Sequence, residues 1–206
     1  MTFLKKHLPV TIIVIFHLVG FIGFLISPAY FRALTPFNLL LSGLLLLITS
    51  GQTKWKFYAV MTGVALAGYF VEVAGVKTGL IFGHYHYGSA LGIKWLSVPL
   101  LIGLNWALLI YATSQFFSFS NKYVNAFFAA ILMVALDFFI EQSAARFDFW
   151  YWQNARIPLQ NYIAWFIISF VIHVFSDAEL SKKPNITAKA FFVVQVVFFA
   201  ALYIFA

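Results

Sequence analysis

The chain has 206 residues, of which 63% are hydrophobic and 9% are charged, and it contains no cysteine. Soluble domains carry about a quarter charged residues, so this composition excludes a soluble protein and predicts a single integral membrane domain over residues 1–206. The net charge of +7 comes from scattered Lys and Arg residues, so no nucleic-acid partner is expected, and the missing thiols exclude disulfides and thiolate metal sites.

Apolar segments long enough to cross a membrane occupy residues 9–27, 35–51, 57–75, 95–117, 123–142, 158–176 and 187–206. The expected fold class is therefore all-α, a polytopic bundle of about seven transmembrane helices. No small-x-small cleavage site stands out after the first segment, so we expect a retained helix rather than a signal peptide.

Basic residues between these segments predict the orientation, because cytoplasmic loops carry an excess of Lys and Arg. The N-terminus and the even-numbered loops hold Lys5, Lys6, Lys54, Lys56, Lys122, Lys182, Lys183 and Lys189, whereas the odd-numbered loops hold Arg32, Lys77, Lys94, Arg146 and Arg156. The expected location is the plasma membrane of a bacterium or an archaeon, with the N-terminus in the cytoplasm and membrane lipid around the bundle.

The stretch from Glu72 to Pro99 differs from the rest of the chain, because it gathers a carboxylate, five glycines and several His, Tyr and Lys residues between apolar segments. Its loop at 76–94 and the loop at 143–157 both follow odd-numbered segments, so they emerge on one face of the membrane in either orientation. Glycine tolerates tight turns and close backbone approach, which favours a loop folded back over the mouth of the bundle.

Carboxyl groups lie near this common face. Glu72 is near the end of the third segment, and Asp137 and Glu141 share one side of the fifth. Carboxyl groups at membrane depth are costly and usually face the bundle interior, so each is a functional candidate. An apolar site favours their neutral form, which is a proton donor. The structural alternatives are that Glu141 pairs with Arg146 and that Glu72 reaches the interface.

The sequence Gly-His-Tyr-His-Tyr-Gly places His84 and His86 on one side of an extended segment. Hydrogen-bonding or proton-relay roles are favoured over a metal pair with Glu72 or a simple aromatic belt, so no metal site is predicted. His17 and His173 stand alone on apolar segments and are expected to be satisfied packing residues.

The second loop carries four consecutive aromatic residues, among them Trp150 and Trp152. Such residues are commonly interfacial anchors, but beside buried acids their ring faces stabilise a cation. Asn105 and Asn161 are suited to orienting a water molecule or joining helices. The seventh segment lacks a central lysine, and the chain lacks histidine boxes and a Gly-rich nucleotide loop, so no cofactor is expected.

Each of the two loops, together with the apolar segments beside it, carries a distinctive pattern of residues. The first is Glu72-x-x-Gly75-x-Lys77-Thr78-Gly79-x-x-Phe82-Gly83-x-Tyr85-x-Tyr87, continuing to Leu91-Gly92 and Val98-Pro99; the second is Asp137-x-x-x-Glu141, Ala144-Ala145, Phe149-Trp150-x-Trp152 and Ile157-Pro158-Leu159-x-Asn161-x-x-x-Trp165. Together they resemble the membrane carotenoid-biosynthesis hydratases, which include carotenoid 1',2'-hydratases and bisanhydrobacterioruberin hydratase. The chain departs from that pattern where Gln142 replaces a proline and where a glycine-rich insertion is shortened to 153–156.

The resemblance implies a cofactor-independent hydratase, a hydro-lyase that adds water to the terminal C1,2 double bond of an acyclic carotenoid end group. It implies Glu72, Asp137 and Glu141 as catalytic residues, one donating the proton and another orienting or deprotonating water. The implied substrate-binding residues are Tyr85, Tyr87, His84, His86, Trp150, Trp152, Asn161 and Trp165. The implied partners are a lipophilic carotenoid and other enzymes of the carotenoid pathway.

Other functions remain open at this point. An end-group cyclase begins with the same protonation but excludes water from the cation. A carotenoid or lipid carrier, or a small proton-coupled transporter, would use the carboxyl groups without catalysis. A histidine-ligated metal or haem protein would depend on His84 and His86.

Overall fold

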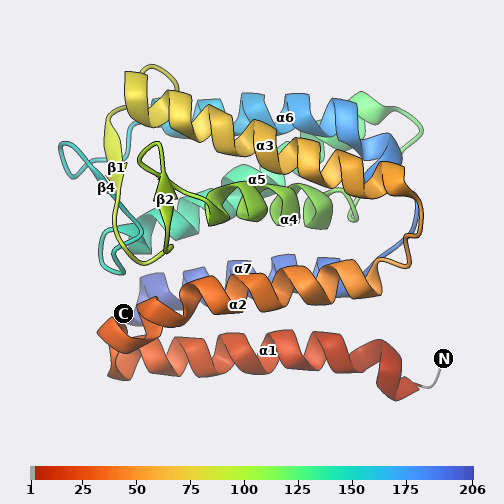
Figure 1. Cartoon of the computed structure of the whole chain (residues 1–206), viewed down its shortest axis with the longest axis horizontal. Helices are drawn as coiled ribbons and strands as arrows, with labels where there is room; N and C mark the ends of the chain where they lie inside the picture. Colours follow the sequence, from red (N-terminus) through yellow and green to blue (C-terminus); the bar gives the residue numbers. More distant parts are fainter. Residues whose placement is uncertain (1–2) are drawn as a thin grey trace.

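The computed structural model describes residues 3–206, with side chains from His7 onward, so the side chains of Lys5 and Lys6 lie outside the described part. Its helices are α1 (Phe3–Ile26), α2 (Pro28–Thr49), α3 (Trp55–Thr78), α4 (Leu101–Thr113), α5 (Lys122–Ala144), α6 (Leu159–Leu180) and α7 (Ile186–Phe205). Short strands β1 (Tyr85–Tyr87), β2 (Lys94–Trp95), β3 (Val98–Pro99) and β4 (Trp150–Trp152) lie in two loops. The helices run alongside one another, and both strand-bearing loops lie at one end of the bundle (Figure 1).

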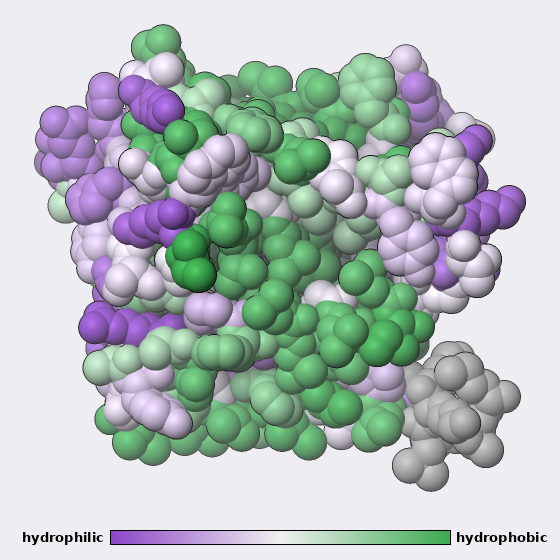
Figure 2. Space-filling view, in the orientation of Figure 1, coloured by the Kyte–Doolittle hydropathy of each residue, from purple (hydrophilic) through white to green (hydrophobic). Residues whose placement is uncertain are grey.

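The prediction of an all-α membrane bundle is confirmed. Six of the helices described are long and apolar enough to cross a membrane, and α4 is a shorter apolar helix. Figure 2 shows apolar residues across the middle of the visible face and polar residues gathered at its two ends. Large apolar side chains such as Phe175, which is 83% exposed, therefore face lipid rather than water.

The predicted bounds of the fourth segment, residues 95–117, are wrong. Lys94 pairs with Pro99 and Trp95 pairs with Val98 in the β2–β3 hairpin, so α4 does not begin until Leu101. Its 13 residues span about 20 Å, less than the ~30 Å hydrocarbon core. Nearly every residue from Trp106 to Thr113 is buried, so α4 is an internal helix enclosed by its neighbours.

The third and fifth helices extend further toward the loops than their apolar segments indicate. α3 continues to Thr78, where Gly79 adopts a left-handed conformation with φ 67° and donates its N–H to the Gly75 carbonyl. α5 continues to Ala144. The candidate carboxyl groups therefore lie deeper in the bundle than the sequence alone places them.

The two loops lie on the same face, as predicted, and they are joined directly. β1 and β4 pair antiparallel, with Tyr85 opposite Trp152 and Tyr87 opposite Trp150. Just beyond the strand, Gly88 donates its N–H to the Phe149 carbonyl at 2.9 Å, and a Cβ at Gly88 would collide with the Asp148 backbone. The paired strands form a lid over the end of the bundle, which we call the β1–β4 lid.

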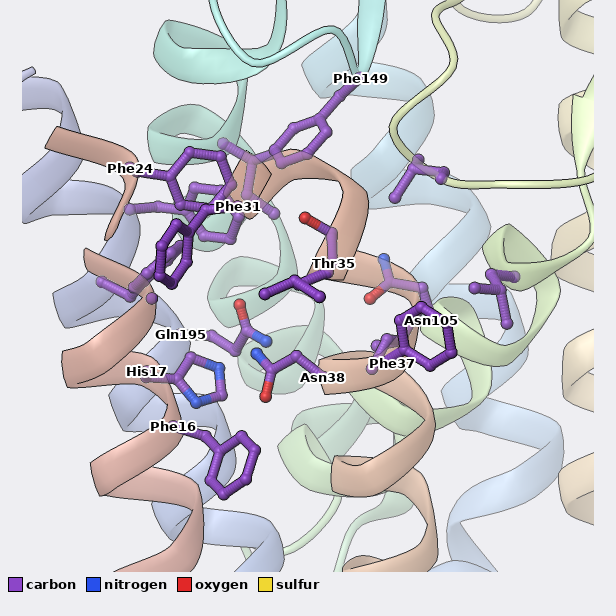
Figure 3. Close-up of a pocket in the computed structure, with 18 of the residues that line it drawn as sticks. Phe16, His17, Phe24, Phe31, Thr35, Phe37, Asn38, Asn105, Phe149 and Gln195 are labelled. Atoms are coloured by element: carbon purple, nitrogen blue, oxygen red, sulfur yellow. The ribbon is translucent and has the colours of Figure 1, made fainter. Parts of the chain in front are cut away.

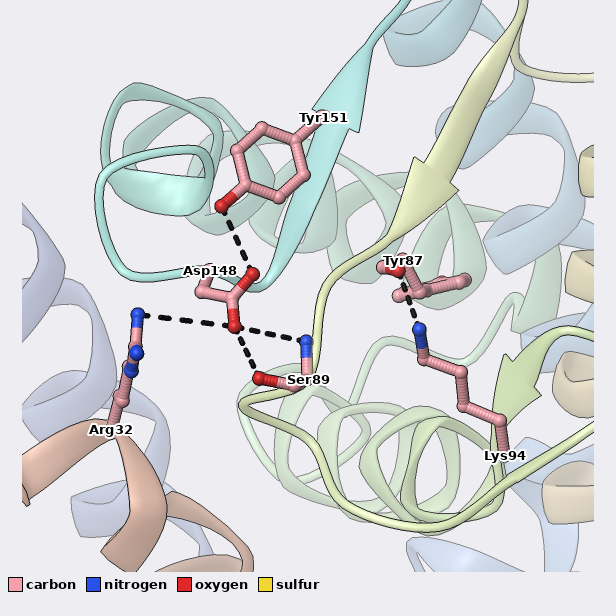
Figure 4. Close-up of polar contacts among 6 residues, drawn as sticks. All are labelled: Arg32, Tyr87, Ser89, Lys94, Asp148 and Tyr151. Atoms are coloured by element: carbon pink, nitrogen blue, oxygen red, sulfur yellow. Dashed lines mark hydrogen bonds and ion pairs between the residues drawn. The ribbon is translucent and has the colours of Figure 1, made fainter. Parts of the chain in front are cut away.

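Asp148 anchors this lid (Figure 4). Its carboxylate accepts hydrogen bonds from the backbone N–H and the hydroxyl of Ser89 and from the Tyr151 hydroxyl, and Arg32 of α2 lies 3.9 Å away. Partial burial acts to raise the pKa of Asp148, but the Ser89 and Tyr151 hydrogen bonds and the Arg32 charge outweigh it and hold this pKa below its ordinary value. Lys94 adds a hydrogen bond of 2.6 Å to the Tyr87 carbonyl.

Candidate active site

Three buried carboxyl groups converge beneath the β1–β4 lid. Glu72 of α3 is 4% exposed, and Asp137 and Glu141 of α5 are 1% and 6% exposed. Glu72 and Glu141 line a cavity of about 30 Å³, which is large enough for a water molecule. Asp137 lies behind this wall and is connected to it through Asn161 of α6, which also lines the cavity.

Glu72 accepts three hydrogen bonds. The hydroxyl groups of Tyr85 and Tyr87 both donate to Oε2, the latter at 2.8 Å, and the Trp106 indole N–H donates to Oε1 at 3.1 Å. Burial, followed by the neighbouring Glu72 carboxyl group, raises the pKa of both tyrosines above the ordinary value. The phenols therefore keep their protons and remain donors, which fixes both oxygens of Glu72 in place.

Glu141 is held in a similar way, and it is coupled to Asp137. Trp150 and Trp152 donate their indole N–H groups to Glu141 Oε2 at 3.0 and 2.7 Å. The Asn161 side-chain amide donates to Glu141 Oε1 at 3.1 Å and to Asp137 Oδ2 at 2.8 Å. Asp137 Oδ1 has no hydrogen-bond partner among the described residues. A single amide therefore bridges two carboxyl groups on successive turns of α5.

No cation balances these acids within the described residues. The ion pairs there join Arg32 with Asp148 and Lys182 with Glu179, both away from the cluster. Arg146 lies against the Phe147 ring, so the predicted alternative in which it pairs with Glu141 is not realised. Likewise, Glu72 points into the bundle rather than reaching the interface. Neighbouring carboxyl groups in a dry site without a countercharge do not all ionise together.

The local sequence explains how the donors reach the acids. Successive side chains of a strand point to opposite sides, so β1 directs Tyr85 and Tyr87 inward. Pro158 is the N-cap residue of α6, and its carbonyl accepts the Asn161 N–H at 2.9 Å, which sets Asn161 in the first turn of the helix, beside α5. Donors from two loops and from the helices α4 and α6 thus meet carboxyl groups of α3 and α5.

The structure does not bring His84 and His86 into the cluster. Both side chains are exposed on the outer side of the lid, where the His86 ring stacks on Tyr151 with centroids 5.3 Å apart. Neither imidazole lines the small cavity between Glu72 and Glu141. Across residues 3–206, no group of three or more His, Asp or Glu side chains is arranged to hold a metal ion.

Aromatic rings make up most of the remaining wall. Tyr85 packs on Trp152 at 5.0 Å between centroids, Tyr87 on Trp150 at 6.0 Å, and Trp165 stacks on Trp106 at 4.4 Å. Trp106 was not predicted as a site residue, although it donates directly to Glu72. One sequence signal was available, because Asn105 and Trp106 are adjacent polar-tipped residues in an otherwise apolar segment.

A much larger cavity of about 450 Å³ adjoins the acid cluster. The two cavities share Ile102, Asn105, Ile140 and Trp150 in their walls. The large cavity extends between α1, α2, α4, α5 and α7, and most of its wall is apolar (Figure 3). Phe37 and Phe16 line it yet are 67% and 50% exposed, so the cavity is open to lipid beside α1 and α2. The large cavity thus joins the lipid-facing side of α1 and α2 to the wall of the small cavity that holds Glu72 and Glu141.

Comparison with known proteins gives one result. No curated protein and no solved structure was found to match the chain. A family model described as "Carotenoid biosynthesis protein" matches residues 34–206, which include α3 to α7, the β1–β4 lid and every residue of the acid cluster. By that match over most of its length, this membrane chain belongs to the carotenoid biosynthesis protein family.

Proposed function

We propose that this protein hydrates the terminal C1,2 double bond of an acyclic carotenoid end group. The observation that carries the proposal is the position of three buried carboxyl groups, with no paired cation among the described side chains, beside a largely apolar cavity that opens to lipid. Family membership supports a role in carotenoid biosynthesis, and the geometry supports protonation of an alkene in particular. Such a reaction needs an acid, a water molecule and a ring-lined site.

The substrate would lie with its polyene in the 450 Å³ cavity. Its end group would lie against Asn105 and Trp150, which belong to both cavity walls, and the water molecule would occupy the 30 Å³ cavity between Glu72 and Glu141. The 450 Å³ cavity holds only part of a carotenoid, so the rest of the polyene would extend past Phe37 into the bilayer.

We assign the proton donor to Glu141. Asn161 ties it to Asp137, and two adjacent carboxyl groups in a dry site retain a proton between them. Glu141 is the member of that pair on the cavity wall. Its proton would be transferred to C2. The π electrons of the C1,2 double bond form the new C–H bond, which leaves a tertiary cation at C1.

Glu72 would then act on the water. Like Glu141 it accepts three hydrogen bonds, but no amide joins it to a second carboxyl group with which it could share a proton, so its charge-assisted hydrogen bonds would hold it as the anion. The water oxygen bonds to C1, and its surplus proton passes to Glu72, which gives a tertiary alcohol. Proton return from Glu72 to Glu141 across the cavity restores the site. The faces of Tyr85, Tyr87, Trp150 and Trp152 would stabilise the cation meanwhile.

The test is expression in a host that makes an acyclic carotenoid, followed by chromatography and mass analysis of the pigments. We expect a product heavier by one water molecule, and we expect Glu141→Gln or Glu72→Gln to reduce it by about 10²- to 10⁴-fold. The matched control is Glu179→Gln, because Glu179 pairs with Lys182 near the end of α6, away from the cluster.

The same experiment separates the alternatives. An end-group cyclase would leave the pigment mass unchanged, and a carrier or proton-coupled transporter would leave pigment composition the same in wild type and Glu141→Gln. Absence of any hydrated product from a well-inserted wild-type protein would refute hydration.

Orientation and partners are further parts of this proposal. The loop charges favour a cytoplasmic N-terminus, which would place the β1–β4 lid on the opposite side of the membrane. Because the substrate would enter and leave through lipid, association with other enzymes of the carotenoid pathway would shorten its transfer. Labelling of single cysteines introduced at His86 and at Lys183 tests the orientation, since the two residues lie at opposite ends of the bundle.

A further inference from the structure

A second polar cluster lies in the large cavity, apart from the carboxyl groups. His17 of α1, Thr35 and Asn38 of α2 and Gln195 of α7 line its wall, which is otherwise apolar except for Asn105 and Trp150 on the side of the acid cluster. Figure 3 shows His17, Asn38 and Gln195 grouped in the pocket, with Thr35 above them. The buried atoms His17 Nε2, Thr35 Oγ1 and Asn38 Oδ1 have no hydrogen-bond partner in the part of the chain that the structure describes.

This cluster lies near the middle of the membrane. His17, Asn38 and Gln195 are each about ten residues, or ~15 Å, from the helix end on the lid side, which is half of the ~30 Å hydrocarbon core. Unsatisfied polar groups are costly at that depth, and polar side chains there commonly mark ligand sites. The cluster therefore needs a partner that packing does not supply.

His173 provides an internal comparison. It is also fully buried within an apolar helix, α6, and both of its ring nitrogens are paired, Nδ1 with the Ser169 carbonyl at 2.7 Å and Nε2 with the Thr113 hydroxyl at 2.9 Å. The expectation that His173 is a satisfied packing residue agrees with these contacts. The same expectation for His17 is wrong, because only one of its nitrogens has a partner.

The free atom of His17 specifies the chemistry of its partner. The Ile13 carbonyl can only accept, so the 2.8 Å contact from Nδ1 places the proton of a neutral imidazole on Nδ1. Nε2 is then an acceptor, and the ring, 3% exposed, is held edge-on by Phe198. Asn38 Oδ1 is a second free acceptor. A hydroxyl group can donate to either atom, whereas a ketone, an ether or a hydrocarbon cannot.

We propose that the large cavity recognises an isoprenoid that carries a hydroxyl group, which donates to His17 or Asn38 and accepts from Thr35 or Gln195. No Asp, Glu, Lys or Arg lines this cavity in the described part of the chain, so the ligand is neutral. The inference rests on the proposed function in one respect, which is that the ligand is the substrate. The reacting end group would lie beside the acid cluster, and a hydroxyl group elsewhere on the same molecule would bind His17, Thr35, Asn38 or Gln195.

The test measures binding rather than turnover. Purified full-length protein in lipid nanodiscs is equilibrated with an acyclic carotene and with its monohydroxylated derivative, and bound pigment is quantified after extraction. We expect wild type to prefer the hydroxylated pigment by about tenfold, the contribution of a single net hydrogen bond. His17→Phe and Asn38→Leu should each reduce that preference toward unity while leaving binding of the hydrocarbon unchanged.

Controls separate this site from the acid cluster and from general packing. Ser169→Ala should keep the preference, because Ser169 bonds only to its own helix backbone and lines neither cavity. Glu141→Gln should also keep it even where hydration is lost, so failure of the proposed function and failure of this inference give different results. Equal binding of both pigments by wild type overturns the inference, as does a preference that survives both His17→Phe and Asn38→Leu.

Discussion

Replacing Asn161 with leucine tests the central geometric claim, that one amide holds two carboxyl groups. Asn161 is 2% exposed and donates to Asp137 at 2.8 Å and to Glu141 at 3.1 Å. Leucine has a similar volume but cannot donate. A hydrogen bond contributes about 0.5–1.5 kcal/mol between neutral groups and about 1.5–3 kcal/mol to a charged one. With one neutral and one charged carboxyl group, Asn161→Leu should lower the free energy of unfolding by about 3 kcal/mol.

The assay is the free energy of unfolding in mixed micelles, followed by helical circular dichroism. Asn105→Leu is the matched control, because Asn105 lies on the same cavity wall and no hydrogen bond of its side chain is found in the structure. We expect the control to change stability by less than about 1 kcal/mol. If Asn161→Leu costs no more than Asn105→Leu, the amide does not hold the pair, and the assignment of Glu141 as proton donor loses its basis.

Further predictions concern the lid. Tyr87→Phe removes one donor to Glu72 and keeps the ring, so the hydration rate should fall by about tenfold with the fold intact, as measured by pigment conversion. Gly88→Ala should separate β1 from β4, because its Cβ would overlap the Asp148 backbone, and amide hydrogen exchange in the lid should rise. The folded-state pKa of Asp148 is below the ordinary Asp value, so the stability that Asp148 adds to the lid is complete above about pH 4 and is lost as the pH falls through the folded-state pKa. Amide hydrogen exchange in the lid should therefore rise at that low pH in wild type, and Asp148→Asn should abolish this pH dependence. Lid exchange that stays constant as the pH is lowered in wild type would contradict the anchoring role of Asp148.

Much of the architecture could be predicted from the sequence, since hydropathy alone identifies helices that must satisfy their backbone within lipid. The common face of the two loops follows from counting helices, because each crossing reverses direction. The choice of Glu72, Asp137 and Glu141 as candidate residues follows from the cost of carboxyl groups at membrane depth. These inferences depend on chain order and composition, which folding does not alter.

Other features depended on the tertiary structure. The β2–β3 hairpin contains the apolar residues Trp95 and Val98, and for this reason the predicted fourth segment began too early. Only the pairing of β2 with β3 shows that α4 begins at Leu101. Residue spacing indicates that His84 and His86 share a side, but the pairing of β1 with β4 determines that the tyrosines face Glu72 instead. The cavity with an unpaired His17 exists only once α1, α2 and α7 pack together, because an orphan atom is defined by neighbours from elsewhere in the chain.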